Sequence, residues 1–213
     1  MEYKTTTKLF KGTYQYKIVL ICATAAIFRS GDMDSTLAQL QKIEIGKPNT
    51  DMYSVYRLRN AIKTQEELDY AFAIHSQLVV MRDMEVRVET PWITVYSNSI
   101  QDINTLASLN EKFVKYICTP PANTLLEEGT IIMPKMNYEF RVTVGKTTSE
   151  HSAFIQWAEG NSNLKLTKSC KKELLRSRSW GGTHFYITGA NALLMAKMHL
   201  GGCIAKVERI IKA

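Results

Sequence analysis

The sequence has few cysteines and histidines, and neither residue type forms a ligand or catalytic pattern. The four cysteines among the 213 residues are widely spaced and include no C-x-x-C pair: Cys22, Cys118, Cys170 and Cys203. This spacing excludes a disulfide framework and a zinc module. The four histidines are dispersed and give no catalytic triad. We therefore expect reduced thiols, in the cytoplasm or inside a viral particle, and no bound metal.

Cofactor motifs are also missing. The sequence contains no G-x-G-x-x-G, H-E-x-x-H, G-x-S-x-G or EF-hand pattern, so we expect no cofactor. Gly145-Lys146-Thr147 is similar to the end of a phosphate-binding P-loop, but Phe140 stands where that loop needs its first glycine. The sequence therefore argues against nucleotide hydrolysis.

Lys146 is left as a weaker anion-binding candidate. A helix predicted over 149–159, with Thr147 and Glu150 as a capping box, would leave free N–H groups beside this lysine. Lys146 and that helix N-terminus could bind one phosphate or carboxylate. The alternative is an ordinary capped helix with a solvated lysine.

The sequence lacks a long hydrophobic run. The longest, Ile18 to Phe28, has 11 residues, whereas a helix that crosses a bilayer needs about 20. Lysines precede this run, but no small-x-small cleavage site follows it before Arg29. We predict a buried strand here, no signal peptide and no membrane partner.

Positive charge is plentiful but unevenly placed. The net charge is +7; residues 1–119 hold 14 Lys/Arg against 13 Asp/Glu, while residues 120–213 hold 13 against 7. Pro120-Pro121 stand at this change, and two prolines can continue neither a strand ladder nor a helix interior. We predict an N-terminal α+β module over 1–119 and a basic C-terminal α+β module over 120–213.

Apolar periodicity and capping residues predict the secondary structure. We expect a polar loop at 46–51 and a weak helix at 53–62. Helices are predicted at 34–43 with Asp34 as cap, from Thr64 onward with Glu67 completing a capping box, and at 100–109, 149–159, 168–178 and 190–200. Strands are predicted at 14–23, 85–89, 92–97, 112–118, 129–133, 138–144, 164–166, 183–188 and 204–212.

The two halves follow a similar order of elements. The segment that begins at Trp92 aligns with the one that begins at Thr183, as strand, loop, helix and strand. The helices capped by Thr64 and Thr167 correspond more loosely. One hypothesis is a diverged duplication of an α+β module of roughly 90–110 residues, built from βαβ units and mixed sheets. The other is a chance resemblance between two βαβ units.

The most basic stretch follows Thr167, a good N-cap. A helix over 168–178 would gather five cations within an arc of about 160°: Lys168, Lys171, Lys172, Arg176 and Arg178. Like charges three or four residues apart cost an isolated helix about 0.2–0.5 kcal/mol per pair, so an anionic partner is expected. Trp180 lies just before Gly181-Gly182, in a turn that could present its ring to a base.

These observations predict a non-enzymatic nucleic-acid-binding protein, with single strands favoured over duplexes. Its contacts would come from the five cations and Trp180. A solvated basic helix explains the same charges. A structural subunit of a larger assembly, such as a viral particle or nucleoprotein complex, is the first alternative function. A nucleic-acid-processing enzyme is the second, because carboxylates such as Asp32 and Glu85 could converge on metal ions.

Overall fold

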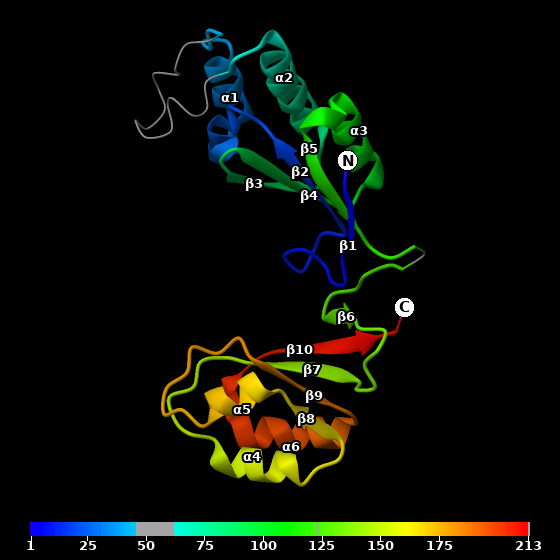
Figure 1. Cartoon of the computed structure of the whole chain (residues 1–213), viewed down its shortest axis with the longest axis vertical. Helices are drawn as coiled ribbons and strands as arrows, with labels where there is room; N and C mark the ends of the chain where they lie inside the picture. Colours follow the sequence, from blue (N-terminus) through cyan, green and yellow to red (C-terminus); the bar gives the residue numbers. More distant parts are fainter. Residues whose placement is uncertain (46–61, 123, 213) are drawn as a thin grey trace. The chain divides into compact units, whose positions relative to one another are not determined.

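The chain folds into two compact units, Met1–Leu126 and Glu127–Ala213 (Figure 1). The computed structural model describes residues 1–45, 62–122 and 124–212, so the predicted loop at 46–51 and all but the last residue of the weak helix at 53–62 lie outside the described residues. Each unit combines a five-stranded mixed sheet with helices. The predicted fold class, α+β with two similar modules, is confirmed. The division between residues 119 and 120 stays a prediction.

The sheet of the first unit has the strand order β1-β5-β2-β4-β3. β1 is parallel to β5, and the other neighbours are antiparallel. The three residues of β1 are exposed and show no apolar alternation, which explains why no strand was predicted there. The strands are β1 Tyr3–Thr5, β2 Tyr16–Ile21, β3 Met84–Glu89, β4 Trp92–Ser97 and β5 Val114–Thr119.

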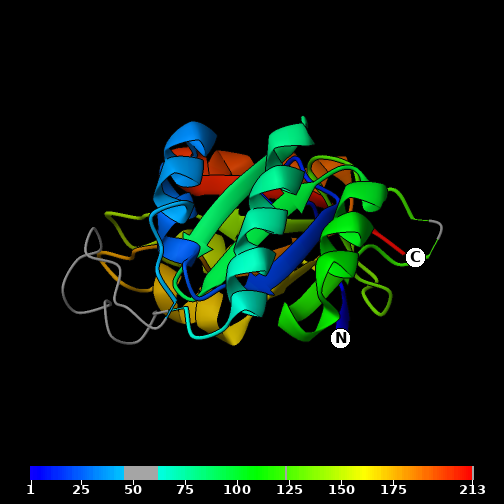
Figure 2. The same ribbon diagram turned by 90° about the horizontal axis from the view of Figure 1, so that it is seen from above.

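The helices of the first unit cover one face of this sheet (Figures 1 and 2). Alternate residues of the central strands, such as Ile18 and Leu20 in β2 and Ile93 in β4, point into the core that the helices complete. His75 is buried in the helical stripe with Nε2 2.8 Å from the carbonyl oxygen of Met33. The helices are η1 Ala25–Ser30, α1 Met33–Leu40, α2 Gln65–Val80, α3 Ile100–Leu109 and η2 Glu111–Phe113.

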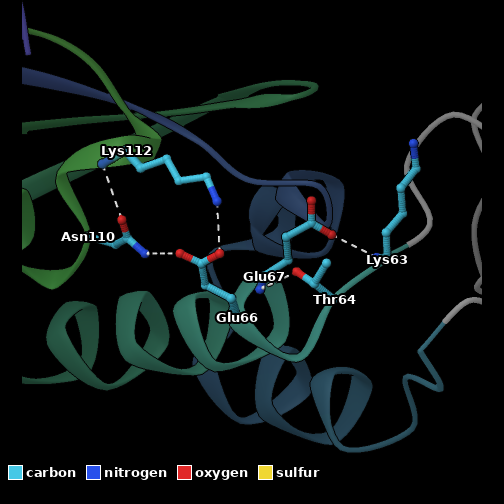
Figure 3. A network of polar contacts seen from close by, with 6 residues as sticks. All are labelled: Lys63, Thr64, Glu66, Glu67, Asn110 and Lys112. Atoms are coloured by element: carbon cyan, nitrogen blue, oxygen red, sulfur yellow. Dashed lines mark hydrogen bonds and ion pairs between the residues drawn. The ribbon is translucent and has the colours of Figure 1, made fainter.

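Side-chain caps fix the starts of α1 and α2. Thr64 Oγ1 accepts the backbone N–H of Glu67 at 3.2 Å, and the Glu67 carboxylate accepts the N–H of Lys63 at 2.7 Å (Figure 3). The capping box is confirmed, with its return bond one residue earlier than the usual position. The cap of α1 is Asp32, not Asp34, because Asp32 Oδ1 accepts the N–H groups of the first turn.

Glu66 connects α2 to the turn before β5. Its carboxylate accepts from Asn110 Nδ2 at 2.9 Å and from Lys112 Nζ at 2.8 Å (Figure 3). These bonds lower the pKa of Glu66, first through Lys112 and then through Asn110. Glu66 therefore stays ionised and links two elements that are distant in sequence.

The sheet of the second unit has the order β6-β10-β7-β9-β8, and its helices also lie on one face (Figure 1). β6 is parallel to β10, and the other pairs are antiparallel. The strands are β6 Thr130–Ile132, β7 Phe140–Val144, β8 Leu164–Leu166, β9 His184–Ile187 and β10 Ile204–Ile211. The helices are α4 Ser152–Glu159, α5 Lys168–Leu174, α6 Ala190–Leu200 and η3 Gly201–Cys203.

The two sheets share one topology. In each, the first strand in sequence lies beside the fifth, and the rest follow as second, fourth and third, a split βαβ arrangement with an added edge strand. The last three elements of the two units begin 90 residues apart, at 100 and 190, 111 and 201, and 114 and 204. The alignment expected from the sequence is therefore correct in this part.

The correspondence expected between the Thr64 and Thr167 helices is wrong. α2 precedes β3, so its counterpart is α4, which precedes β8. α5 instead lies between β8 and β9, where the first unit joins β3 to β4 through residues 90 and 91 alone. Residues 167–183 are therefore an addition to the shared topology, and they contain most of the predicted site.

Candidate functional site

The basic helix α5 begins where predicted but ends earlier. Thr167 Oγ1 accepts the N–H of Cys170 at 3.2 Å and donates to the carbonyl oxygen of His184 at 2.7 Å. The predicted end at Arg178 is wrong, because the helix stops at Leu174. The carbonyl oxygen of Leu174 accepts the N–H of His151 at 2.9 Å and does not take part in a further helical hydrogen bond. The five cations therefore do not share one helical face.

Two of the predicted cations already have acidic partners. Lys171 forms an ion pair with Glu159, and Arg176 NH1 lies 2.7 Å from Glu173 Oε1. Within residues 1–45, 62–122 and 124–212, no ion pair is found for Lys168, Lys172 or Arg178, and all three are exposed. These three side chains can bind an external anion without giving up an internal one.

Backbone pairing carries the end of β7 alongside the segment before β9. The N–H of Gly182 donates to the carbonyl of Val144 at 2.8 Å. Thr147 and Ser179 then exchange two backbone bonds, of 3.1 and 3.0 Å. This pairing brings Lys146, from one segment, next to Arg178 and Trp180, from the other.

The paired segments form a pocket of about 270 Å³, called the Trp180 pocket below, lined by Lys146, Thr147, Thr148, Arg178, Ser179 and Trp180. Lys146 Nζ lies 5.2 Å from the centroid of the Trp180 ring, within the range of a cation–π contact. The Trp180 side chain is nevertheless 82% exposed. The volume lies below the roughly 300–1,000 Å³ of pockets that enclose a drug-sized ligand, so it suits a smaller group.

The helix N-terminus predicted beside Lys146 is not there. α4 begins at Ser152, and its N-cap His151 makes no side-chain cap bond. The predicted capping box of Thr147 and Glu150 is therefore wrong, because Thr147 is drawn into the backbone pairing with Ser179. The Thr147 hydroxyl is buried with no partner in the described part of the chain.

The Gly145-Lys146-Thr147 segment does not form a phosphate cradle. The N–H of Gly145 donates to the carbonyl of Cys203 at 2.6 Å, and that of Thr147 donates to Ser179. Both backbone donors are thus used inside the protein, whereas a P-loop directs such groups at the ligand. Lys146 contributes its side-chain charge to the Trp180 pocket instead.

A cysteine and a histidine that the sequence did not connect lie close together. Cys203 Sγ is 3.6 Å from His151 Nε2, across η3 and the start of α4. The sequence gave no signal for this pair, because the two residues are distant and form no motif. Neither lines the Trp180 pocket. Among the described residues, no group of three or more His, Cys, Asp or Glu side chains could hold a metal ion.

The arrangement offers one exposed ring and two cations in a single shallow site. It can stack on a planar group and neutralise an adjacent anion. No protein-family model, curated protein or solved structure matches this chain. None of the described helices is both long enough and apolar enough to span a bilayer.

Proposed function

We propose that the second unit binds single-stranded nucleic acid at the Trp180 pocket. The observation that supports this is the Trp180 ring, 82% exposed and flanked by Lys146 and Arg178. An exposed aromatic ring stacks on any base, and neighbouring cations neutralise the backbone. Single strands are favoured because their bases are free to leave the stack.

The exposure of Trp180 is not explained by packing. Trp157 is partly buried and packs on Phe154, with 5.7 Å between ring centroids. Burying a large apolar side chain stabilises a fold by about 1.5–3 kcal/mol, a gain that Trp180 does not provide. The ring is held in solvent by residues 167–183, which the shared topology does not require.

The unpaired cations of α5 extend the proposed contact. Lys168 and Lys172 are four residues apart, which places them on one side of the helix with a rise of about 6 Å. Lys171 and Arg176 contribute less to binding, because a phosphate would have to compete with Glu159 or Glu173. We therefore expect the six predicted residues to contribute unequally to binding.

Fluorescence anisotropy with labelled single-stranded DNA and RNA, at several salt concentrations, tests the proposal. Trp180→Ala should cost about 1–3 kcal/mol of binding free energy if the ring stacks on a base. Lys146→Gln with Arg178→Gln, or Lys168→Gln with Lys172→Gln, should reduce the log–log salt slope by up to about 0.7 per lost contact. Lys171→Gln with Arg176→Gln should change both quantities less.

A charge-matched control separates site binding from general attraction. Lys42→Gln with Arg82→Gln removes two exposed cations from the first unit and should leave the affinity nearly unchanged. Equal losses in this control and in the pocket variants would show that net charge alone attracts the strand. Failure of the parent protein to bind either nucleic acid at low salt would reject the proposal.

The first alternative function, a subunit of a larger assembly, has one observation in its favour. Helix α6 exposes three large apolar side chains, Leu194, Met195 and Met198. Such a face is typical of a surface that a protein partner covers. The second alternative, a nucleic-acid-processing enzyme, has no such supporting observation: among the described residues no group of three or more His, Cys, Asp or Glu side chains could hold a metal ion.

A further inference from the structure

The four cysteines of the chain differ in their exposure to solvent. Cys22, Cys118 and Cys170 are buried. Burial raises the pKa of all three thiols, that of Cys170 to about 11, so they stay protonated near neutral pH. Cys203, at the end of η3, is only half-buried. It is therefore the thiol that a reagent in solution can reach.

Cys203 also has a basic partner. Its Sγ atom lies 3.6 Å from Nε2 of His151, within hydrogen-bonding distance for sulfur. A thiol attacks as its thiolate, and a base within this reach can take up the proton. Backbone hydrogen bonds anchor both residues: the N–H of His151 donates to the carbonyl of Leu174 at 2.9 Å, and the carbonyl of Cys203 accepts at 2.6 Å from Gly145. A nucleophile and a base are thus held side by side.

The first unit carries other residues at these two positions. α4 and η3 of the second unit correspond to α2 and η2 of the first. The N-cap of α2 is Thr64, whose hydroxyl caps the helix, and η2 ends at Phe113, whose ring stacks on Tyr70. The second unit has His151 and Cys203 instead, and His151 makes no side-chain cap bond. A cap contributes about 0.5–2 kcal/mol, so helix stability does not explain this histidine.

A structural link between the two elements does not explain the pair either. In the first unit Glu66 of α2 forms an ion pair with Lys112 of η2 at 2.8 Å (Figure 3). The corresponding residues of the second unit are Ala153 and Gly202, which have no charged group. A thiol is a weak hydrogen-bond donor, so the contact of Cys203 with the imidazole would be a poor replacement for that ion pair.

We propose that Cys203 is a thiolation site, with His151 as its base and a low-molecular-weight disulfide, R–S–S–R, as its substrate. The thiol proton moves to Nε2 of His151, and Sγ attacks one sulfur of the disulfide. The S–S bond of the reagent breaks as the new S–S bond to Cys203 forms. The departing thiolate takes the proton from His151 and leaves as R–SH. The reagent is itself the oxidant, so the exchange needs no other.

Oxidised glutathione, added to the folded full-length protein, tests the proposal. Mass spectrometry of peptides, after the remaining thiols are blocked, follows the mixed disulfide at each cysteine. Cys203 should react at least about tenfold faster than the three buried thiols, and dithiothreitol should reverse the product. Cys203→Ser should leave no fast-reacting thiol. Cys203 reacting no faster than the buried thiols would overturn the proposal.

His151→Asn tests the base. Asparagine is smaller than histidine and a favourable N-cap, so it opens access to Cys203 and stabilises the start of α4. A purely structural role of His151 therefore predicts an unchanged or faster reaction. Loss of the base should instead slow the reaction at Cys203 by about tenfold or more. Circular dichroism checks that the variant is folded.

His199→Asn is the matched control. His199 lies four residues before Cys203, is exposed and stacks on Trp157 with 5.0 Å between ring centroids. Its loss should leave the rate at Cys203 nearly unchanged. An unchanged rate in His151→Asn, or an equal loss in this control, would overturn the proposal. The experiment uses no nucleic acid, and neither Cys203 nor His151 lines the Trp180 pocket, so the proposed function can fail while this proposal stands.

Discussion

The backbones of Gly145 and Gly181 pass so closely that a Cβ added to Gly181 would lie 2.3 Å from the carbonyl carbon of Gly145. Gly181 also has a φ of +78°, a conformation that L side chains rarely adopt. This contact lies between the two backbone pairings that hold the segments of the Trp180 pocket together, Gly182 with Val144 and Thr147 with Ser179. The geometry of the pocket therefore depends on a position that accepts no side chain.

Gly181→Ala should lower the stability of the second unit and open the Trp180 pocket. The left-handed φ alone costs a residue with a Cβ about 1–2 kcal/mol, and the clash adds about 1–3 kcal/mol. Gly182→Ala is the matched control, because Gly182 has a φ of +85° with nothing within 4 Å of the added carbon. Urea unfolding measures the free energy of unfolding of both variants. Equal losses of stability would mean that the close approach of Gly145 and Gly181 has no energetic effect.

Thr167→Ala should shorten or fray α5. The side chain caps the helix at Cys170 and also donates to His184, so its loss should cost about 0.5–2 kcal/mol. Thr167→Ser keeps the hydroxyl and should retain most of the stability. Chemical denaturation of the three proteins checks this. A Ser variant as weak as the Ala variant would show that the methyl group, not the cap, stabilises the site.

Acid should destabilise the second unit through Glu208. Burial alone would raise the pKa of this carboxyl, but hydrogen bonds and positive charge from Lys206 and Arg141 outweigh it and hold the pKa below its ordinary value of 4.5. A lowered folded pKa means that the carboxylate's contribution is complete above pH 4.5 and is lost as the pH falls through the folded pKa.

Glu208→Gln should therefore cost about 1.5–3 kcal/mol near neutral pH and flatten the loss of stability below pH 4.5. Glu150→Gln, at an exposed position, should leave the pH profile of the parent unchanged. Free energies of unfolding, measured from pH 7 down to the lowest pH at which the protein stays folded, test both expectations. A variant that keeps the full acid dependence of the parent would exclude Glu208 as its source.

Limited proteolysis should cut first between Thr119 and Glu128. Leu125 is 75% exposed and offers a site to thermolysin, whereas Leu126 is buried and exchanges two hydrogen bonds with Gln15. Mass spectrometry of the first fragments locates the cut. Initial cleavage confined to residues 46–51 would contradict the division at 119 and 120.

Local signals explain which elements could be predicted from the sequence. The bounds of α3, α6 and β8 agree with the prediction, because an apolar period, a cap or a glycine stop marks each of them. β1 and the end of α5 could not be predicted in this way. β1 depends on its pairing with β5. The end of α5 depends on two backbone contacts that are distant in sequence: the N–H of His151 donates to the last residue of the helix, Leu174, and Thr147 pairs with Ser179 beyond it.

The candidate site could be predicted only in part. Lys146 and Trp180 were each identified for a separate reason, one as part of a glycine-lysine-threonine segment and the other as the residue after a basic stretch. The contact between Lys146 and Trp180 depends on the pairing of Thr147 with Ser179, and no local sequence pattern predicts this pairing. Their role in nucleic-acid binding stays a prediction.

The long connection between β8 and β9 has an evolutionary consequence. Residues 167–183 replace what is a two-residue turn in the first unit, yet the strand order on either side is the same. Closing the longer connection costs only about 0.6 kcal/mol for each doubling of its length, or roughly 2 kcal/mol in all. A module of this kind can gain or lose such a segment without a change in its strand order. Common ancestry would then be visible in the strand order, and a specialised function in this one connection.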